Sequence, residues 1–543
     1  MCAAKAEDLA KNRKCSEGLL RGMGSGTSGR SATGQERPSC AVPKGMSGRD
    51  KAKPKHGCAQ RESEGCVVPM KAVQDNAAEG RRPALVGFPA GGKHEGMACT
   101  TRVNLPSGRT AVPQKWEKVR RLQWKLYGAA KRQPERKFHA LWQCITDRHT
   151  LWEAWRRVDA NHGAAGVDGE KLKTIKDRGV EEFIESLQSD LKAGTYQPQC
   201  VRRVHIPKGN GKTRPLGIPT VRDRVVQRAV KLVIEPLFEA DFKECSYGFR
   251  PKRNAIQALE ELRKSAPRGY EWAVEVDIQS YFDTIDHGRL MKLVERRISD
   301  RKVLKLIRKW LEAGVLEEGQ RKETWVGTPQ GGVISPLLAN LYLHELDRAW
   351  QREMTSVGKL VRYADDFVVV CRDEADAKRA YEWIIGTLTR LGLTAHPEKT
   401  RIVHLRVQGI DFLGCHLRMA MSRRYRGRWY LYRWPNQKAM KRIRDRIREL
   451  THCRHSGMKL ADVIGAINPV LRGWGAYFRN GNAAVKFIQI DAYVRERLTI
   501  FANRVRGRND PHWVREFGYR WYASLGVHRL MGNIRYPVAA RAA

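Results

Sequence analysis

The chain has 543 residues, with 101 Lys or Arg residues against 58 Asp or Glu residues, which gives a formal charge of +43. This length allows roughly three or four domains of about 150 residues each, with a sizeable buried core. So high a charge causes self-repulsion unless a polyanion neutralises it, so we expect a nucleic-acid partner rather than a merely soluble basic protein.

The sequence shows no clear pattern for a membrane-spanning segment or for a zinc site. No run approaches the ~18 consecutive apolar residues of a membrane span, and the N-terminus has neither an apolar signal core nor a cleavage-like site. None of the twelve cysteines forms a CxxC pair, which argues against a zinc knuckle and for reduced thiols in the cytosol. His452, Cys453 and His455 have no second pair of ligands nearby, so we interpret them as polar loop residues.

Residues 1–112 differ in composition from the rest of the chain. They contain 16 glycines, 19 Lys or Arg against 10 Asp or Glu, and one aromatic residue, Phe88. So little apolar surface cannot offset the entropy lost on ordering, so we predict a disordered basic extension. Gly24, Gly26 and Gly29 match the GxGxxG pattern, but a Gly-Ser-Thr run surrounds them instead of the strand and helix that dinucleotide binding needs.

A helical segment and then a β-hairpin are predicted next along the chain. From Trp116 to Leu151, apolar residues recur at helical spacing among basic ones, which predicts a helical basic segment. Residues 201–219 read as two short strands around a turn at 209–211, which is typical of a hairpin. The hairpin contains Gly211-Lys212-Thr213, the end of a Walker loop, but Ile206 stands where that motif needs its first glycine. A P-loop ATPase is therefore excluded.

Three carboxylates stand at the ends of predicted strands. Residues 271–278 alternate apolar and polar side chains, which predicts a strand with Asp277 at its end. A second strand signal over 360–370 contains Asp365 and Asp366 in its middle. Neighbouring side chains on a strand point to opposite faces, so both acids can serve one site only at a turn. We therefore place Asp365 and Asp366 at a hairpin tip.

Converging carboxylates on a strongly basic protein need a counter-charge. Mg²⁺ takes one or two carboxylates and completes its octahedron with water and substrate phosphate. Two such ions, about 3.5–4 Å apart, can activate an attacking 3′ hydroxyl and stabilise a leaving pyrophosphate. By itself an Asp-Asp pair is also compatible with a solvated turn, so the pattern alone leaves both alternatives open.

Further sequence blocks occur in an order that resembles a known family. They are Ile206-Pro207-Lys208, Arg214-Pro215-Leu216-Gly217-Ile218-Pro219, Ser246-Tyr247-Gly248-Phe249-Arg250-Pro251, Tyr281-Phe282-Asp283, Gly327-Thr328-Pro329-Gln330-Gly331-Gly332, Ser335-Pro336, Tyr363-Ala364-Asp365-Asp366, His396-Pro397-Glu398-Lys399-Thr400 and Phe412-Leu413-Gly414. Together they closely resemble the group II intron-encoded reverse transcriptases over about residues 115–510. The resemblance implies an α+β fold with the right-hand polymerase architecture of fingers, a palm with an antiparallel sheet, and a helical thumb.

The domain ranges that follow from this resemblance cover the whole chain. We expect a disordered extension over 1–112, an N-terminal segment and fingers over 113–265, a palm over 266–420, a thumb or maturase (X) domain over 421–508, and a short tail over 509–543. The tail lacks the clustered His, Asn and Cys of the family's HNH endonuclease domain, so the chain resembles the endonuclease-lacking branch.

The resemblance also implies roles for individual residues. Asp277, Asp365 and Asp366 would be catalytic and would hold two Mg²⁺ ions, assisted by the backbone carbonyl of Ile278. Lys208 and Arg214, with Arg203 beside them, would grip the incoming triphosphate. Phe282 would lie beneath the sugar and exclude a 2′ hydroxyl. The remaining two nucleotide-binding residues would be Gln330, on its glycine-rich loop, and Lys399, near the transferring phosphates.

The C-terminal third carries the densest positive charge. Residues 423–454 contain twelve basic residues against Asp445 and Glu449. Within them, an apolar stripe at helical spacing predicts an amphipathic helix; it consists of Met440, Ile443, Ile447 and Leu450. Such a helix could lie on a membrane surface, but Trp429 and its aromatic neighbours up to Trp434 favour RNA. We expect the RNA contacts to come from Arg442, Arg444, Arg446 and Arg448.

The block from Pro469 to Arg479 is similar to the maturase domain that acts as the thumb in these enzymes. Retron and diversity-generating enzymes resemble the same palm but would not be expected to carry this thumb. We expect the Trp and Tyr residues of this block to pack between helices rather than to stack on bases.

Taken together, the resemblance implies an RNA-directed DNA polymerase of a mobile group II intron. It would copy intron RNA into cDNA for retrohoming and assist splicing as a maturase, with intron RNA, a DNA target or primer and deoxynucleoside triphosphates as partners. We expect a cytoplasmic bacterial protein associated with the nucleoid, in no contact with membranes and of unknown oligomeric state. Two alternatives remain: a polymerase-inactive RNA-binding splicing cofactor, and a CRISPR-associated or domesticated reverse transcriptase.

Overall fold

A computed structural model describes the part of the chain that carries these motifs. The described residues are 115–207, 213–317, 320–322, 327, 331–422, 425, 427–505 and 519–535. All of them belong to one compact unit. The extension predicted over 1–112 lies outside the described residues, as do Lys208 and Gln330. Within the described ranges, no helix is long and apolar enough to cross a membrane.

The basic segment expected over 116–151 forms three helices. They and the next two are α1 (Lys115–Arg132), α2 (Trp142–Ile145), α3 (Arg148–Asp159), α4 (Leu172–Arg178) and α5 (Val180–Ala193). The first helix ends just before Pro134, because the residue that precedes a proline is disfavoured in helical conformation. The third begins at an N-cap, where the Asp147 carboxylate accepts a hydrogen bond of 2.9 Å from the backbone N–H of His149.

The predicted hairpin is confirmed in its two strands, β1 (Val201–Pro207) and β2 (Thr213–Ile218), which pair antiparallel. Two short strands, β4 (Val315–Glu317) and β5 (Gln320–Lys322), extend this sheet to the order β2-β1-β4-β5. The last two strands lie in the range expected for the palm, yet β4 pairs with β1, which lies in the range expected for the fingers, and β5 pairs with β4. The turn expected at 209–211 lies outside the described residues.

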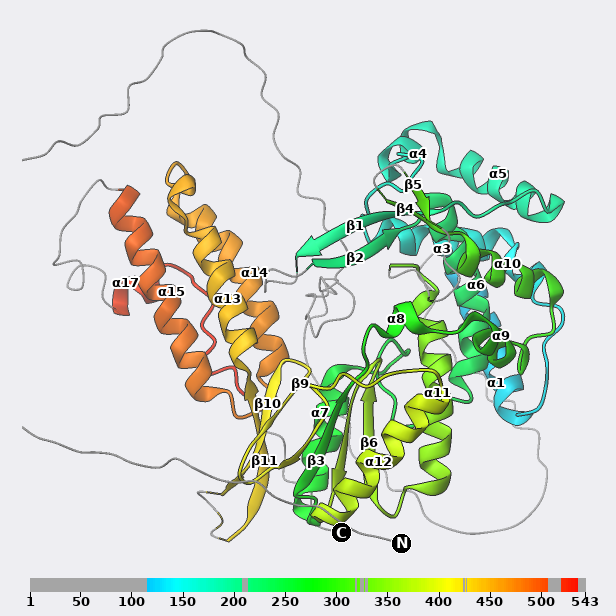
Figure 1. Cartoon of the computed structure of the whole chain (residues 1–543). Coiled ribbons are helices and arrows are strands. Elements are labelled where there is room, and N and C mark those ends of the chain that lie inside the picture. Colours follow the sequence, from blue (N-terminus) through cyan, green and yellow to red (C-terminus); the bar gives the residue numbers. More distant parts are fainter. Residues whose placement is uncertain are drawn as a thin grey trace, which may run out of the picture. The chain divides into compact units, whose positions relative to one another are not determined.

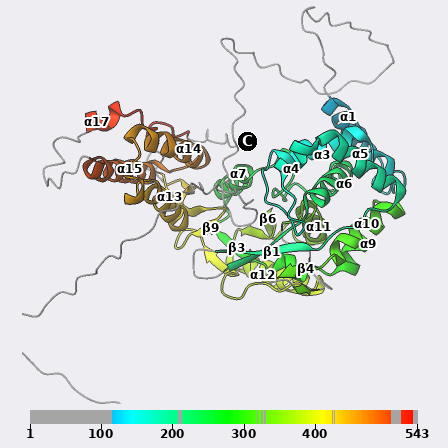
Figure 2. The ribbon, with the colours of Figure 1, turned by 90° about the horizontal axis from the view of Figure 1, so that it is seen from above.

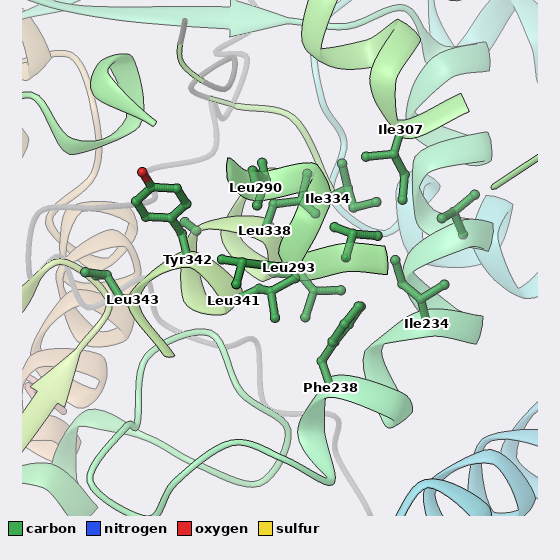
Figure 3. Packing of buried hydrophobic residues seen from close by; sticks show 14 of the residues in the cluster. Ile234, Phe238, Leu290, Leu293, Ile307, Ile334, Leu338, Leu341, Tyr342 and Leu343 are labelled. Atoms are coloured by element: carbon green, nitrogen blue, oxygen red, sulfur yellow. The ribbon is translucent and has the colours of Figure 1, made fainter. Parts of the chain in front are cut away.

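A helical core joins the fingers to the palm. The helices concerned are α6 (Val221–Glu239), α7 (Ala255–Ser265), α8 (Tyr281–Thr284), α9 (His287–Glu295), α10 (Arg301–Glu312) and α11 (Ser335–Glu353), with the 3₁₀ turn η1 (Ala266–Arg268) after α7. Figure 3 shows Ile234 and Phe238 of α6 pointing toward Leu338 and Leu341 of α11, with Leu290 of α9 beside them. Burial of these apolar side chains away from water fixes the helices around the palm.

The range expected for the palm contains an antiparallel sheet of four strands in the order β6-β7-β3-β8, which we call the palm sheet. Its strands β3 and β6 are labelled in Figure 1. Its elements are β3 (Trp272–Asp277), β6 (Gly358–Tyr363), β7 (Asp366–Cys371), α12 (Glu374–Arg390) and β8 (Arg401–His404), and α12 packs against β3 and β7. Both faces of the sheet are buried: Phe367 and Val369 face the helical core, whereas Val368 and Val370 face a second apolar cluster. Burial on both sides explains why β7 reads as a continuous apolar run.

The second cluster continues into a small sheet and the C-terminal helices. Their bounds are β9 (Ile410–Phe412), β10 (Cys415–Met421), β11 (Trp429–Pro435), α13 (Gln437–Leu450), η2 (Cys453–His455), α14 (Leu460–Phe478), α15 (Ala484–Val505) and α17 (Tyr519–Ser524). The long helices α13, α14 and α15 pack against one another, side by side in Figures 1 and 2. The sheet runs across residue 420, where we expected the palm to end.

The aromatic residues of the 469–479 block pack within this bundle, as predicted. The Trp474 ring lies 4.8 Å from Phe478 and 5.5 Å from Phe487, measured between ring centroids. Such aromatic pairs contribute packing energy beyond simple area burial.

Two glycines of α14 give opposite predictions for stability. A Cβ at Gly475 would lie 2.6 Å from Cδ2 of the buried Leu530, whereas a Cβ at Gly465 would meet nothing within 4 Å. We expect Gly475→Ala to lower the free energy of unfolding by about 1–3 kcal/mol through overpacking. Gly465→Ala should instead raise it by up to about 1 kcal/mol through helix propensity. Thermal unfolding of both variants checks the pair; two changes of the same sign would contradict this packing.

Candidate active site

The three predicted carboxylates meet at one end of the palm sheet. In the pairing of β3 with β7, Asp277 lies directly opposite Asp366, so their Cβ atoms are about 4.5–5.5 Å apart. Asp365 precedes Asp366 and lies in the turn between β6 and β7. The hairpin tip expected from the sequence is therefore confirmed, and side chains 88 positions apart in the chain become neighbours.

The turn that carries Asp365 is tight and has an unusual first residue. Tyr363 pairs with Asp366, so only Ala364 and Asp365 form the loop. Ala364 has φ of 59°, a left-handed conformation that normally favours glycine. A positive φ at the first loop residue alone is typical of a type II′ hairpin, whose twist matches that of the strands. The two strands are thus joined by a two-residue turn, which keeps Asp365 beside Asp366.

Burial and neighbouring negative charge make Asp365 and Asp366 hard to ionise. Burial raises the pKa of Asp365 to about 6, and the negative charge of Asp277 raises it as well, while the charge of Arg214 opposes the shift. Burial, followed by the charges of Asp365 and Asp277, holds the pKa of Asp366 well above its ordinary value. Charged acids this close to one another stabilise the protein poorly until a cation neutralises them.

The side chain of Lys399 supplies part of the missing positive charge. Its Nζ lies 2.7 Å from Oδ2 of Asp277, and the lysine side chain is 61% exposed. The backbone carbonyl of Asp277 accepts a hydrogen bond of 2.8 Å from the N–H of His396. Lys399 therefore belongs to the site, on a loop that the sequence alone could not bring to Asp277.

The donor set suits Mg²⁺ better than a transition metal. Within the described ranges, no three or more His, Cys, Asp or Glu side chains form a ready-made metal cluster. Mg²⁺ requires none, because it binds through one or two carboxylates and keeps several waters until substrate phosphates replace them. Oxygen donors alone, from Asp277, Asp366 and a carbonyl, are the ligands that this ion prefers.

The hairpin of the fingers separates two arginines that we expected to act together. In the β1–β2 register, Arg214 lies opposite Ile206, whereas Arg203 lies opposite Gly217. Alternate residues of a strand point to opposite faces, so the two guanidinium groups do not share a face. Arg214 lies on the same face as Leu216, and its charge acts on Asp365. The structure therefore brings Arg214, but not Arg203, to the carboxylates.

Phe282 lies beside the loop that leads to Gln330. Its side chain is 6% exposed and belongs to the helical core. A Cβ at Gly327 would lie 2.9 Å from the carbonyl oxygen of Phe282, so glycine is needed for the loop to pass so closely. At the other end of the loop, a Cβ at Gly331 would lie 2.4 Å from the carbonyl oxygen of Gly217. Gly327 and Gly331 thus lie against Phe282 and Gly217, respectively.

The predicted basic helix is confirmed as α13. Three residues of its apolar stripe are buried, namely Met440, Ile443 and Ile447. The predicted arginines lie on the remaining surface, Arg444 partly exposed and the others fully. Arg446 and Arg448 form ion pairs with Glu449 and Asp445. Such exposed pairs contribute little to stability, so these arginines can exchange their partners for phosphates at small cost.

Sequence reasoning missed the residues that hold the turn from below. Arg362 is fully buried, forms an ion pair with the buried Asp347, and donates a hydrogen bond of 2.9 Å to the carbonyl of Ala364. The sequence feature that could have pointed to Arg362 is a charged residue within an apolar strand segment, three positions before Asp365. A buried arginine in a strand is rare unless it is paired.

Comparisons with known proteins agree with this geometry. Residues 206–417 match the family described as reverse transcriptase (RNA-dependent DNA polymerase), and residues 440–518 match the group II intron maturase-specific domain. Protein YkfC of Escherichia coli is 37% identical over 344 residues, which cover 56% of this chain and 90% of YkfC. The group II intron-encoded protein LtrA of Lactococcus lactis is 43% identical over 214 residues, which cover 39% of this chain and 35% of LtrA.

Among solved structures, a chain of a partial Cas6-RT-Cas1–Cas2 complex matches with a TM-score of 0.30 and 25% identity, covering 46% of this chain and 41% of that one. The chain thus spans about a third of LtrA and most of YkfC.

The raised pKa of Asp365 predicts how stability depends on pH without metal. A folded-state pKa of about 6, against ~3.9 when unfolded, means that stability falls as pH rises between these values and is lowest above them. Asp365→Asn should therefore stabilise the protein in a chelating buffer by about 1–2 kcal/mol at pH 8 and by less at pH 5. Thermal unfolding measures this, with the exposed Glu398→Gln as control. An equal gain at both pH values would contradict the assignment.

Proposed function

Because the chain belongs to the family of group II intron-encoded reverse transcriptases and maturases, we propose that it copies intron RNA into cDNA and assists splicing by binding that RNA. One observation carries the catalytic half of this proposal. Asp277 lies opposite Asp366 on paired strands, with Asp365 in the adjoining turn. A carboxylate set at a strand end on a basic protein suits phosphoryl transfer to a 3′ hydroxyl.

The chain's own groups divide the work at this site. Asp277, Asp365 and Asp366, with the carbonyl of Ile278, would hold two Mg²⁺ ions. When bound, these ions supply Lewis-acid stabilisation of the attacking and leaving oxygens. The carboxylates fix the position of this charge, and their buried setting strengthens each electrostatic contact because water is largely excluded.

Basic side chains around the carboxylates would orient the nucleotide. Arg214, whose charge reaches Asp365, suits a bidentate contact with phosphate, and Lys399 can move from Asp277 to a phosphate oxygen because it is exposed. Lys208 and Gln330 keep the nucleotide-binding role that the family resemblance gives them. Phe282 would close the pocket beneath the sugar, where a bulky ring leaves no room for a 2′ hydroxyl. We leave Arg203 out of this set, since it lies on the opposite face of the hairpin.

The helix α13 would provide the RNA-binding surface. Four arginines project from one helix whose apolar side packs into the bundle, so the charge is held on a rigid element. Lys and Arg contacts to phosphates release counterions, which makes binding depend on salt. Intron RNA would be the partner of this surface, and the RNA itself would catalyse splicing.

The main alternative is a splicing cofactor that binds RNA but does not polymerise. It explains α13 and the maturase domain equally well. It gives no reason for three carboxylates at a strand end, where burial and neighbouring negative charge raise the pKa of Asp365 and Asp366, because a binding scaffold for a polyanion gains nothing from them. The intact carboxylate site therefore favours the polymerase.

Primer extension on an RNA template tests the catalytic half directly. We expect Mg²⁺-dependent extension by the full chain and a loss of about a thousandfold in rate for Asp365→Ala, since several kcal/mol of charge stabilisation disappear. Glu374→Ala, an exposed acid on α12, is the matched control and should keep the wild-type rate. If wild type and Asp365→Ala were equally inactive while both promoted splicing of the host intron, the binding-cofactor alternative would hold.

The salt dependence of RNA binding tests the role of α13. Replacing Arg442, Arg444 and Arg446 by Gln should reduce the slope of log K against log salt concentration by about two, since each lost phosphate contact removes ~0.7–0.9. The control replaces three exposed basic residues of α12, namely Lys378, Arg379 and Arg390. Removal of residues 1–110 should also change the slope less than the α13 variant. Equal slopes for the two triple variants would mean that the RNA does not bind at α13.

A further inference from the structure

A buried polar cluster lies directly beneath the carboxylate turn. It consists of Arg362 on β6 with Asp347 and Asn340 on α11, and we refer to it as the Arg362 cluster. The exposed fraction is 0% for Arg362 and Asp347 and 2% for Asn340. Nε of Arg362 lies 2.8 Å from Oδ1 of Asp347, and the second guanidinium contact to this carboxylate is shorter. The fork of the guanidinium thus binds the carboxylate through two parallel hydrogen bonds.

The same guanidinium holds the turn. Its NH1 donates to the carbonyl of Ala364 at 2.9 Å and to Oδ1 of Asn340 at 3.1 Å. Asn340 in turn donates to the carbonyl of Gly248 at 2.7 Å. A Cβ at Gly248 would lie 2.4 Å from the backbone nitrogen of Ala364, so the two backbones touch. The turn is therefore held on one side by the guanidinium of Arg362 and on the other by the backbone of Gly248.

The position of the cluster separates it from the substrate. Arg362 pairs with Phe367, whose side chain faces the helical core, so Arg362 lies on that face of the sheet. Asp277 and Asp366 share the other face with Val368. Asp347 neutralises much of the guanidinium charge, so the cluster acts on the turn chiefly through hydrogen bonds, although the positive charge of Arg362 also lowers the pKa of Asp365.

Stability alone does not explain such a cluster. Replacing a buried ion pair by apolar residues of similar volume is often neutral or stabilising, so the pair is weak evidence for a stabilising role. The cluster instead holds the turn in a strained conformation. Ala364 has a φ of 59°, which an alanine disfavours.

We propose that Arg362 is a positioning residue, which acts through the carbonyl of Ala364 to fix the direction of the Asp365 and Asp366 carboxylates toward the bound cations. This inference rests on the proposed metal-dependent polymerase site. In this proposal, Asp347 and Asn340 hold the guanidinium of Arg362 in its orientation.

The test compares cation binding with catalysis in four variants of the full chain. Arg362→Lys keeps the charge but loses the fork; we expect Mn²⁺ binding, followed by electron paramagnetic resonance, to weaken about tenfold. In Mg²⁺-dependent primer extension, kcat should fall about 10- to 100-fold. The KM for the deoxynucleotide and the Kd for RNA should change less than twofold. The double variant Arg362→Met, Asp347→Leu should fold as stably as wild type and show the same losses, which a purely structural role would not produce.

Rescue and control complete the design. Ala364→Gly in the Arg362→Lys background should restore most of the lost Mn²⁺ affinity and kcat, because glycine adopts a positive φ without cost. The control is Arg297→Lys, which alters another buried arginine that bonds Asp241 and several backbone carbonyls away from the turn. It should lower the melting temperature while kcat per folded molecule and Mn²⁺ binding stay unchanged.

Two outcomes would overturn the inference. One is wild-type Mn²⁺ affinity in both Arg362→Lys and the apolar double variant; the other is an equal loss in Arg297→Lys. Weakened Mn²⁺ binding in a protein whose wild-type form does not extend primers would uphold the positioning role and instead refute the proposed polymerase function.

Discussion

The mutual repulsion of three carboxylates at the end of the palm sheet is the constraint around which the surrounding structure is organised. Asp277 and Asp366 lie opposite each other on paired strands, and a two-residue turn adds Asp365. The raised pKa values of Asp365 and Asp366 express the cost of this arrangement without metal. A cation-binding site is destabilised in this way when it is empty, because the negative charges that repel one another are the same charges that bind the cation.

Rigidity under that repulsion comes from burial on both sides of the sheet. One face packs on α12 within the helical core, and the other packs on the cluster that continues into β9–β11 and the helices α13, α14 and α15. Repelling side chains on a half-exposed hairpin could move apart by bending its strands. Here the close packing of two cores opposes that movement, since packed interiors yield little to local strain.

The arginines serve two physically different purposes. Buried ones join segments that are distant in sequence: Arg297 bonds Asp241 and backbone carbonyls after α1, and Arg433 on β11 donates to the carbonyl of Asn480 in the turn between α14 and α15. The planar fork of arginine makes it suitable for such multiple contacts. On α13, Arg446 and Arg448 form exposed ion pairs with Glu449 and Asp445, which contribute little to stability. The net charge of +43 therefore overstates the charge that is free to bind RNA.

Local pattern was enough to determine much of this protein. The strand ending at Asp277, the β1–β2 hairpin, the hairpin tip at Asp365 and the amphipathic α13 were all predicted, because period and turn chemistry depend on neighbouring residues alone. The order of motifs also indicated the family. Only the tertiary structure decided three further matters: that Arg203 and Arg214 lie on opposite faces, that β4 and β5 join the fingers, and that Arg362 holds the carboxylate turn through Asp347. Each depends on strand register or on contacts between distant segments, which long-range packing sets and no local pattern encodes.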